Sequence, residues 1–312
     1  MPQIEELNLS KREIPSGIII TVLLFAVSIY LPILGFIISF LIPLPILYYR
    51  SKLGRNAVIL ISIGSIFIGS FFSGGVSADI GFFIVLMAIG FSIGEAIDKK
   101  FSIEKTIGYA CLTIILLVIA ILVLYSGIFN KDIVTLISEH IEQNLKLTLV
   151  MYKGMGMPQE HIDLLSNSLD KIQYILLRII PALFIASTCL VTWLSLILIK
   201  PIFLKKGLYY PEFGELKSWK APEQIIWVLI GCGVSLIIPE LFLNILGLNG
   251  LIVLFTIYFF QGIAIVSFYF DKHKFPILLK VILYSFIVIN HLLLLFVIGV
   301  GIFDMWLNFR KI

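Results

Sequence analysis

The side chain with the most suggestive chemistry is a lone amide inside an apolar stretch. Residues 251–270 read LIVLFTIYFFQGIAIVSFYF, carry no formal charge, and hold Gln261 at their middle. Twenty such residues form about 30 Å of helix, which matches one hydrocarbon core. The amide then has no water around it and needs a partner on a neighbouring helix or a bound molecule. Gly262 leaves a gap beside it, through which another backbone or a ligand can approach closely.

Other polar side chains inside or beside apolar runs are candidates for the same ligand site. Polar groups at membrane depth usually face the bundle interior or a cavity, and they often mark a ligand path. In this hypothesis Gln261 and Asn290 hydrogen-bond the ligand and Arg178 guards its entrance. The alternatives are that Arg178 snorkels to the outer interface and that Glu240 is exposed there. The further candidate ligand-binding residues are Asn290, His291, Glu240 and Arg178.

Acid–base catalysis and metal binding find little support. Within or near the apolar runs, only Glu240, His291 and Asp304 carry side chains suited to proton transfer. The motifs HExxH, GxSxG and the Walker A loop are absent from the chain. His140 and His161 lie in a polar stretch at a spacing that is not typical of a metal site. We therefore predict that the protein is not an enzyme and that it holds no metal and no cofactor.

The end of the chain carries a separate polar pattern in the segment GIFDMWLNFR. If this segment is helical, Asp304 and Asn308 share one face, and Trp306 and Arg310 share another, because residues four apart are neighbours on a helix. Asp304 and Arg310 are therefore the candidate residues of this C-terminal motif.

Prolines interrupt several of the apolar runs. Pro43 and Pro45 are two residues apart in LGFIISFLIPLPILYYR, and Pro239 lies toward the far end of an expected span over residues 225–246. Because proline has no N–H group, it leaves carbonyl groups that must face protein or a cavity. Two interpretations remain open: simple kinks, or broken helices that line a substrate cavity.

Composition assigns the chain to the membrane. Hydrophobic residues make up 60% of it, charged residues only 13%, and the mean hydropathy is +1.08, unlike a soluble domain. We expect an all-α, polytopic bundle of about nine to ten transmembrane segments. The length favours a single membrane domain over residues 1–312, without a separate soluble domain. The net charge of +4 reflects basic cytoplasmic loops, so no nucleic-acid partner is expected.

The distribution of Lys and Arg predicts the orientation. These residues are concentrated in loops that fall inside if the N-terminus is inside. Residues 1–15 and the basic loop 204–224 are then cytoplasmic, and residues 130–172 form an extracytoplasmic amphipathic helix pair that GMGMP interrupts. The last apolar run, 276–304, is either one tilted span or a hairpin turning near Asn290. We expect a multi-pass protein of the bacterial cytoplasmic (inner) membrane.

Five segments carry a resemblance to a known family. They are LPILGFIISFLIPLPILYYRSKLG, LRIIPALFIASTCLVTWL, FGELKSWKAPEQIIW, YFFQGIAIVSFYF and the closing GIFDMWLNFR. This pattern resembles the YybS-like family of uncharacterised bacterial integral membrane proteins over nearly the whole chain. The resemblance implies no catalytic residues, because that family has no established biochemical function. The N-terminal pattern is also similar to the substrate-binding S-components of energy-coupling-factor transporters.

Three functions remain open. The first is small-molecule binding or transport, energised by a partner subunit or a gradient because the chain has no ATPase motif. The second is a membrane scaffold that recruits cell-envelope or division proteins through the basic loop or the amphipathic pair. The third is an intramembrane enzyme acting on a lipid carrier. The expected partners are the lipid bilayer, a small-molecule substrate, and a membrane protein partner or energising subunit.

Overall fold

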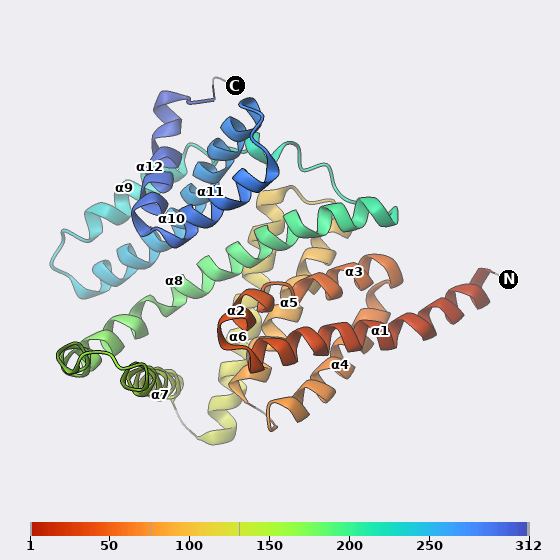
Figure 1. Ribbon diagram of the computed structural model, residues 1–312, viewed down its shortest axis with the longest axis horizontal. Coiled ribbons are helices and arrows are strands. Elements are labelled where there is room, and N and C mark those ends of the chain that lie inside the picture. Colours follow the sequence, from red (N-terminus) through yellow and green to blue (C-terminus); the bar gives the residue numbers. More distant parts are fainter. Residues whose placement is uncertain (1, 76, 131, 311–312) are drawn as a thin grey trace. The chain divides into compact units, whose positions relative to one another are not determined.

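A computed structural model describes residues 2–75, 77–130 and 132–310, and all regular elements in these ranges are helices (Figure 1). The chain divides into two compact units. The first comprises Met1–Ile121 and Ser187–Phe213, and the second comprises Leu122–Ala186 and Gly214–Ile312. The all-helical fold expected from the sequence is confirmed, whereas the single membrane domain over residues 1–312 stays a prediction.

The helices confirm a multi-pass membrane protein. Seven helical segments in the described part of the chain are long and apolar enough to cross a bilayer, and a bent helix pair adds an eighth candidate. The seven are Glu13–Tyr30, Leu34–Leu53, Arg55–Phe72, Asp79–Asp98, Ile103–Ile128, Gln159–Lys206 and Leu241–Lys272. This count is lower than the nine to ten segments expected, because one predicted span is a helix of only 11 residues, Ile225–Ser235.

The first unit is built around a broken helical segment. The helices that begin in it are α1 (Pro2–Tyr30), α2 (Pro32–Ser39), α3 (Pro43–Leu53), α4 (Arg55–Phe72), α5 (Ala78–Asp98) and α6 (Ile103–Phe129). A first break lies between α1, which ends at Tyr30, and α2, which starts at Pro32. A second break precedes Pro43, which begins α3, a position where a missing N–H group does no harm.

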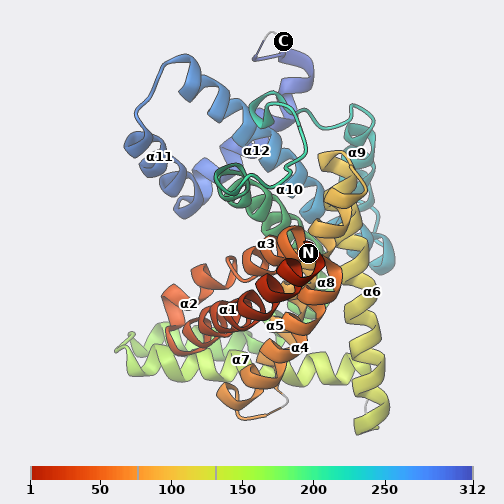
Figure 2. The same ribbon diagram turned by 90° about the vertical axis from the view of Figure 1, so that its right-hand side faces the viewer.

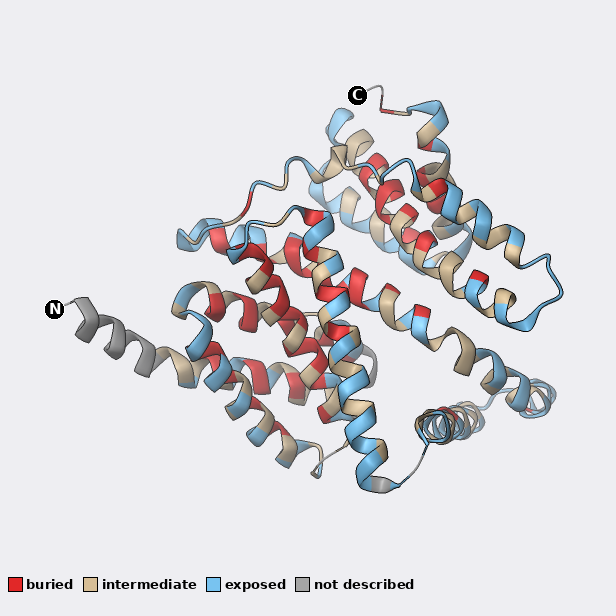
Figure 3. Cartoon of the chain, turned by 180° about the vertical axis from the view of Figure 1, so that it is seen from behind, coloured by how far each residue is buried: buried red, intermediate tan, exposed pale blue. Residues whose placement is uncertain are grey.

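Pro43 and Pro45 are buried in the contact between α3 and α5. A Cβ atom built at Gly90 would lie 2.4 Å from the carbonyl oxygen of Pro43, and one built at Gly94 would lie 2.5 Å from the Arg50 side chain. The glycine pair on α5 therefore admits the first and last turns of α3. Both prolines pack against protein here, and buried residues are frequent along α3 and α5 (Figure 3).

A charge cluster fixes the end of α3 to the end of α5. The Arg50 guanidinium donates to the carboxylates of Glu95 and Asp98 at 2.7 Å each, and it lies over the Phe91 ring at 4.7 Å. Its side chain is only 4% exposed.

The second unit contains the amphipathic pair. It consists of α7 (Ile133–Gly154) and the start of α8 (Gln159–Lys206). The Gln173 amide donates to the backbone oxygen and the hydroxyl of Ser138, which ties the two helices together. The break at GMGMP is confirmed, and Gly156 adopts a φ of 74° in the turn. The α8 helix then continues without interruption through the sixth predicted span.

The remaining helices of this unit are α9 (Ile225–Ser235), α10 (Leu241–Lys272), α11 (Ile277–Ile289) and α12 (His291–Leu307), with the short 3-10 turn η1 (Leu216–Ser218). The expected continuous span over residues 225–246 is wrong. The α9 helix ends at Ser235, a turn holds Pro239, and Glu240 immediately precedes α10. Pro239 and Glu240 are exposed. Pro239 therefore does not kink a cavity-lining helix, because its missing N–H group falls where no helix continues.

The last apolar run, for which the sequence left one tilted span and a hairpin open, breaks at Asn290, where α11 and α12 are bent by 100° relative to each other. The start of α11 and the end of α12 both lie near the C-terminal end of α10. Near the start of α11, the Lys280 ammonium pairs with Asp271, and just beyond α12 the backbone oxygen of Phe309 accepts from the Tyr269 hydroxyl. Figure 2 shows α11 and α12 as the two arms of a V. The pair therefore has the shape of a re-entrant hairpin.

Candidate functional site

Gln261 lies in the second half of α10 and not at the midpoint of that helix. The α10 helix begins at Leu241, so Gln261 follows twenty residues, or about 30 Å, later. That length is one full hydrocarbon core. The sequence placed the amide at the middle of a span because it could not show that the helix starts ten residues before Leu251. This position explains how a polar loop reaches the amide: its oxygen accepts a 3.1 Å bond from the backbone N–H of Ala221.

A buried ion pair completes the surroundings of Gln261. The Gln261 amide donates to Asp304 at 3.2 Å, and the Arg310 guanidinium donates to the same carboxylate oxygen at 2.7 Å. The side chains of Asp304 and Arg310 have no exposed surface. The other carboxylate oxygen of Asp304 accepts from the backbone N–H of Phe309 at 3.0 Å. The predicted partner on a neighbouring helix is thus Asp304 on α12.

Arg310 also anchors the loop that precedes α9. Its guanidinium donates 2.9 Å bonds to the backbone oxygens of Lys217 and Trp219. Together with the bond from Ala221 to Gln261, these contacts attach residues 217–221 to both α10 and the C-terminal segment. Charge-assisted hydrogen bonds of this kind are stronger than neutral ones. The loop thus has a fixed position relative to α10 and α12.

Gly262 makes room for a backbone and not for a ligand. A Cβ atom built at Gly262 would lie 2.1 Å from the carbonyl oxygen of Val297, and one built at Gly301 would lie 2.1 Å from that of Tyr258. The two glycines therefore allow α10 and α12 to cross in close contact. The sequence left open whether a backbone or a ligand approaches Gly262. In the described residues, it is the backbone of α12 that does so.

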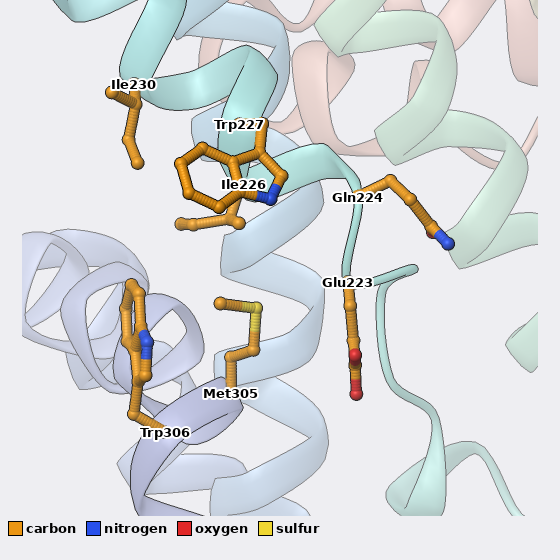
Figure 4. Close-up of a pocket in the computed structure, with 7 residues that line it drawn as sticks. All are labelled: Glu223, Gln224, Ile226, Trp227, Ile230, Met305 and Trp306. Atoms are coloured by element: carbon orange, nitrogen blue, oxygen red, sulfur yellow. The ribbon is translucent and has the colours of Figure 1, made fainter.

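A hollow of about 410 Å³ lies beside this network, between the start of α9 and the end of α12 (Figure 4). Trp227 and Trp306 project into the same space from the two helices, with 74% and 58% of their surfaces exposed. Ile226 forms part of the wall and is buried with Tyr258 and Ile298. The residues that line the hollow and enter the argument are Glu223, Ile226, Trp227, Ile230, Met305 and Trp306.

The buried network fixes both walls of the hollow. Met305 and Trp306 directly follow Asp304, and Glu223 is two residues beyond Ala221, whose N–H group holds Gln261. The walls are therefore positioned before any ligand arrives, which lowers the entropy cost of binding. Sequence reasoning identified Gln261, Asp304 and Arg310 but missed Glu223 and Trp227.

The other predicted ligand residues lie elsewhere. Asn290 caps α12, since its side-chain oxygen accepts from the N–H groups of Leu292 and Leu293. His291 is exposed at the same break. Asp304 follows His291 by thirteen residues, or about 20 Å of helix. Asn290 and His291 therefore cannot line one compact cavity with the Gln261 network.

Arg178 and Glu240 are also far from Gln261. Glu240 precedes α10, so the whole of that helix up to Gln261 separates the two. The Arg178 guanidinium stacks on Tyr174 at 3.2 Å from the ring centre and donates to its backbone oxygen. The backbone oxygen of Arg178 accepts from the Asn249 amide, twelve residues before Gln261 on α10. Asn249, which the sequence did not single out, thus joins α8 to α10.

Comparison with known proteins identifies the family. The family described as "Predicted membrane protein (DUF2232)" matches residues 19–305. The chain belongs to this family. A relative in Bacillus subtilis (strain 168), "Uncharacterized protein YybS", is 22% identical over 292 residues, which cover 91% of each chain. No solved structure matches this DUF2232 protein, so the likeness to S-components stays a prediction.

Three of the segments that carried the family resemblance meet in the second unit of this DUF2232 protein. The loop FGELKSWKAPEQIIW supplies the backbone groups that bind Arg310 and Gln261, the helix YFFQGIAIVSFYF supplies Gln261, and GIFDMWLNFR supplies Asp304 and Arg310. Their convergence marks the network and the adjoining hollow as the candidate functional site. The sequence offered one signal for this site. The first and the third of these segments each contain tryptophan together with polar residues.

Proposed function

We propose that this multi-pass membrane protein binds an amphiphilic small molecule in the hollow between α9 and α12, as the substrate-binding part of a transport system. The observation that carries this proposal is a hollow with two exposed tryptophans and walls that are fixed by a buried ion pair. Small-molecule sites are usually concave, largely apolar and preformed, with a few placed polar groups. Energy for transport would come from a partner subunit or a gradient.

The position of the hollow supports an amphiphile. It lies at the level of Gln261, about one hydrocarbon thickness from the start of α10. Glu223 belongs to the polar loop, whereas Trp227 and Ile230 follow on the first turns of α9. A polar-to-apolar gradient along one wall suits a molecule with a polar head and an apolar tail. Tryptophan is favoured at such interfaces because its ring is both apolar and polar.

Native mass spectrometry of the protein released gently from its own membrane tests this proposal. We expect a stoichiometric small molecule on the wild type and its loss from the double variant Trp227→Ala with Trp306→Ala. Phe242→Ala is a matched control, because Phe242 is 72% exposed on α10 but lies outside the hollow. Retention of the molecule by the double variant would move the site elsewhere, and a bare wild type would end the proposal.

A second candidate is a membrane scaffold, and one observation favours it. The face of α7 that turns away from α8 exposes Leu147, Val150, Met151 and Met155 at helical spacing. Exposed apolar stripes of this kind on a polar helix often bind other proteins. If the protein is a scaffold, Met151→Ser should remove a reproducible protein partner from pull-downs, while the tryptophan double variant should keep it.

The third hypothesis, an intramembrane enzyme, has no geometric support in the described residues. It required Glu240, His291 and Asp304 as acid–base groups, and His291 and Asp304 are separated by about 20 Å of helix. Asp304 is also fully engaged with Arg310, Gln261 and Phe309. These residues therefore cannot act together on one bond.

A further inference from the structure

We infer that the hollow between α9 and α12 selects an amphiphile whose head carries a positively charged amine. This inference rests on the proposed function and names the class of its ligand. It starts from Glu223, a charged residue that lines the hollow together with two exposed tryptophans. An ammonium group is attracted both to a carboxylate and to the face of a tryptophan.

The neighbouring lysines do not neutralise Glu223. The Lys220 ammonium donates to the side-chain oxygen of Asn308 at 3.0 Å. Lys217 pairs with Glu215 at 3.5 Å and with Asp271 at 3.4 Å. The charge of Glu215, followed by the hydrogen bond to Asp271, raises the pKa of Lys217. Among the side chains that the structure describes, no ion pair engages the Glu223 carboxylate.

The buried cation at the back of the site is likewise neutralised. Arg310 pairs with Asp304 at 2.7 Å and also donates hydrogen bonds to the backbone oxygens of Lys217 and Trp219. Among the residues that line the hollow, Glu223 carries the charge that a ligand meets. An anionic head would meet this carboxylate, whereas an ammonium head would pair with it.

The indole rings provide the second set of contacts for the ligand, in addition to Glu223. Figure 4 places Glu223 on one side of Met305 and both tryptophans on the other. A ligand that pairs with Glu223 extends its first methylene groups past the Met305 thioether and between the rings. Met fills irregular gaps and contacts aromatic and aliphatic groups alike. The arrangement suits an alkylammonium or an aminophospholipid. Both present an ammonium group and an apolar chain, and in the aminophospholipid a phosphodiester separates the two.

The test uses the full chain in lipid nanodiscs and the quenching of tryptophan fluorescence by brominated acyl chains. Brominated phosphatidylethanolamine, which has an ammonium group, is compared with brominated phosphatidylglycerol, which has none. Quenching at the hollow is the part of the total fluorescence quenching that disappears in the double variant Trp227→Phe with Trp306→Phe. We expect the ethanolamine lipid to reach half-maximal quenching of this signal at about tenfold lower mole fraction.

Two glutamate variants make the test specific. Glu223→Gln keeps the shape of the side chain and should abolish the tenfold preference. Glu240→Gln removes an exposed carboxylate before α10, outside the hollow, and should leave the preference unchanged. Free dodecylamine separates the two sources of an ammonium head. If it displaces the brominated lipid from the wild type but not from Glu223→Gln, without any lipid preference, the ligand is a free amine.

The remaining outcomes distinguish a failure of the amine selectivity from a failure of the proposed function. Equal quenching by both lipids, with no displacement by dodecylamine, overturns the amine selectivity but leaves an amphiphile in the hollow. Quenching that is the same in the tryptophan double variant overturns the proposed function and, with it, this inference. A preference that survives in Glu223→Gln overturns the role of the carboxylate.

Discussion

Replacing Asp304 by Asn should destabilise the second unit strongly. The substitution removes the negative charge that pairs with Arg310 at 2.7 Å, while the side chains of both residues have no exposed surface. Leaving one partner of a buried ion pair uncompensated costs about 3–5 kcal/mol. Asn retains an oxygen for the Phe309 N–H group, so we expect the lower end of this range, about 3 kcal/mol. That corresponds to roughly a hundredfold change in the unfolding equilibrium.

The assay is equilibrium unfolding in maltoside micelles, followed by helicity, with limited proteolysis of residues 214–224 as a local measure. Asp271→Asn is the matched control. Its carboxylate is 42% exposed and pairs with Lys280 and Lys217, so its loss should cost no more than about 1 kcal/mol. The double variant Asp304→Asn with Arg310→Gln removes both charges and should recover much of the loss.

Two results would refute this reasoning. If Asp304→Asn were no more destabilising than Asp271→Asn, the ion pair would not be shielded from water. If the double variant were as unstable as the sum of the two single variants, Asp304 and Arg310 would not be energetically coupled. In either case the loop 217–221 would also lose its assigned anchor.

Three further predictions concern packing, thiols and orientation. Gly262→Ala should cost about 1–3 kcal/mol because its methyl group meets a backbone oxygen, whereas Gly299→Ala, which meets nothing within 4 Å, should be neutral or slightly stabilising in the same unfolding assay; similar losses would contradict the close crossing. Cys111 and Cys189 have sulfur atoms 3.3 Å apart inside the first unit, so a thiol oxidant should join them in one disulfide found by peptide mass mapping, and an intact pair of thiols would speak against this contact. Met155→Cys should react with an impermeant maleimide in intact cells, because the positive-inside rule places the amphipathic pair outside; labelling only after lysis would reverse the orientation.

Much of the fold followed from local patterns. Residues 251–270 carry no formal charge, which indicated a membrane helix, and α10 contains all of them. The break at GMGMP was predicted because glycine and proline act on the backbone at their own positions. A turn near Asn290 was one of the two alternatives for the last apolar run. In each case neighbouring residues carry the whole signal.

Helix boundaries within apolar sequence were less predictable. The run from Ile225 to Phe270 is apolar apart from a few residues, and it fits either a 22-residue span or a short α9 followed by a long α10. Hydropathy gives the same value for both, because it does not register where the chain turns. The consequence was an incorrect position of Gln261 within its helix and an incorrect helix for Pro239.

The sequence by itself determined that this chain is a multi-pass helical membrane protein, that Gln261 needs a hydrogen-bond partner, and which segments carry the family resemblance. Only the tertiary structure decided that the partner is Asp304, that Arg310 anchors the loop 217–221, and that Asn290, His291, Arg178 and Glu240 belong to other places. It also revealed the hollow lined by Glu223, Trp227 and Trp306. The physical reason is that burial and helix periodicity are local properties, whereas an ion pair or a hollow depends on residues separated by tens of positions whose meeting is set by helix crossing and depth.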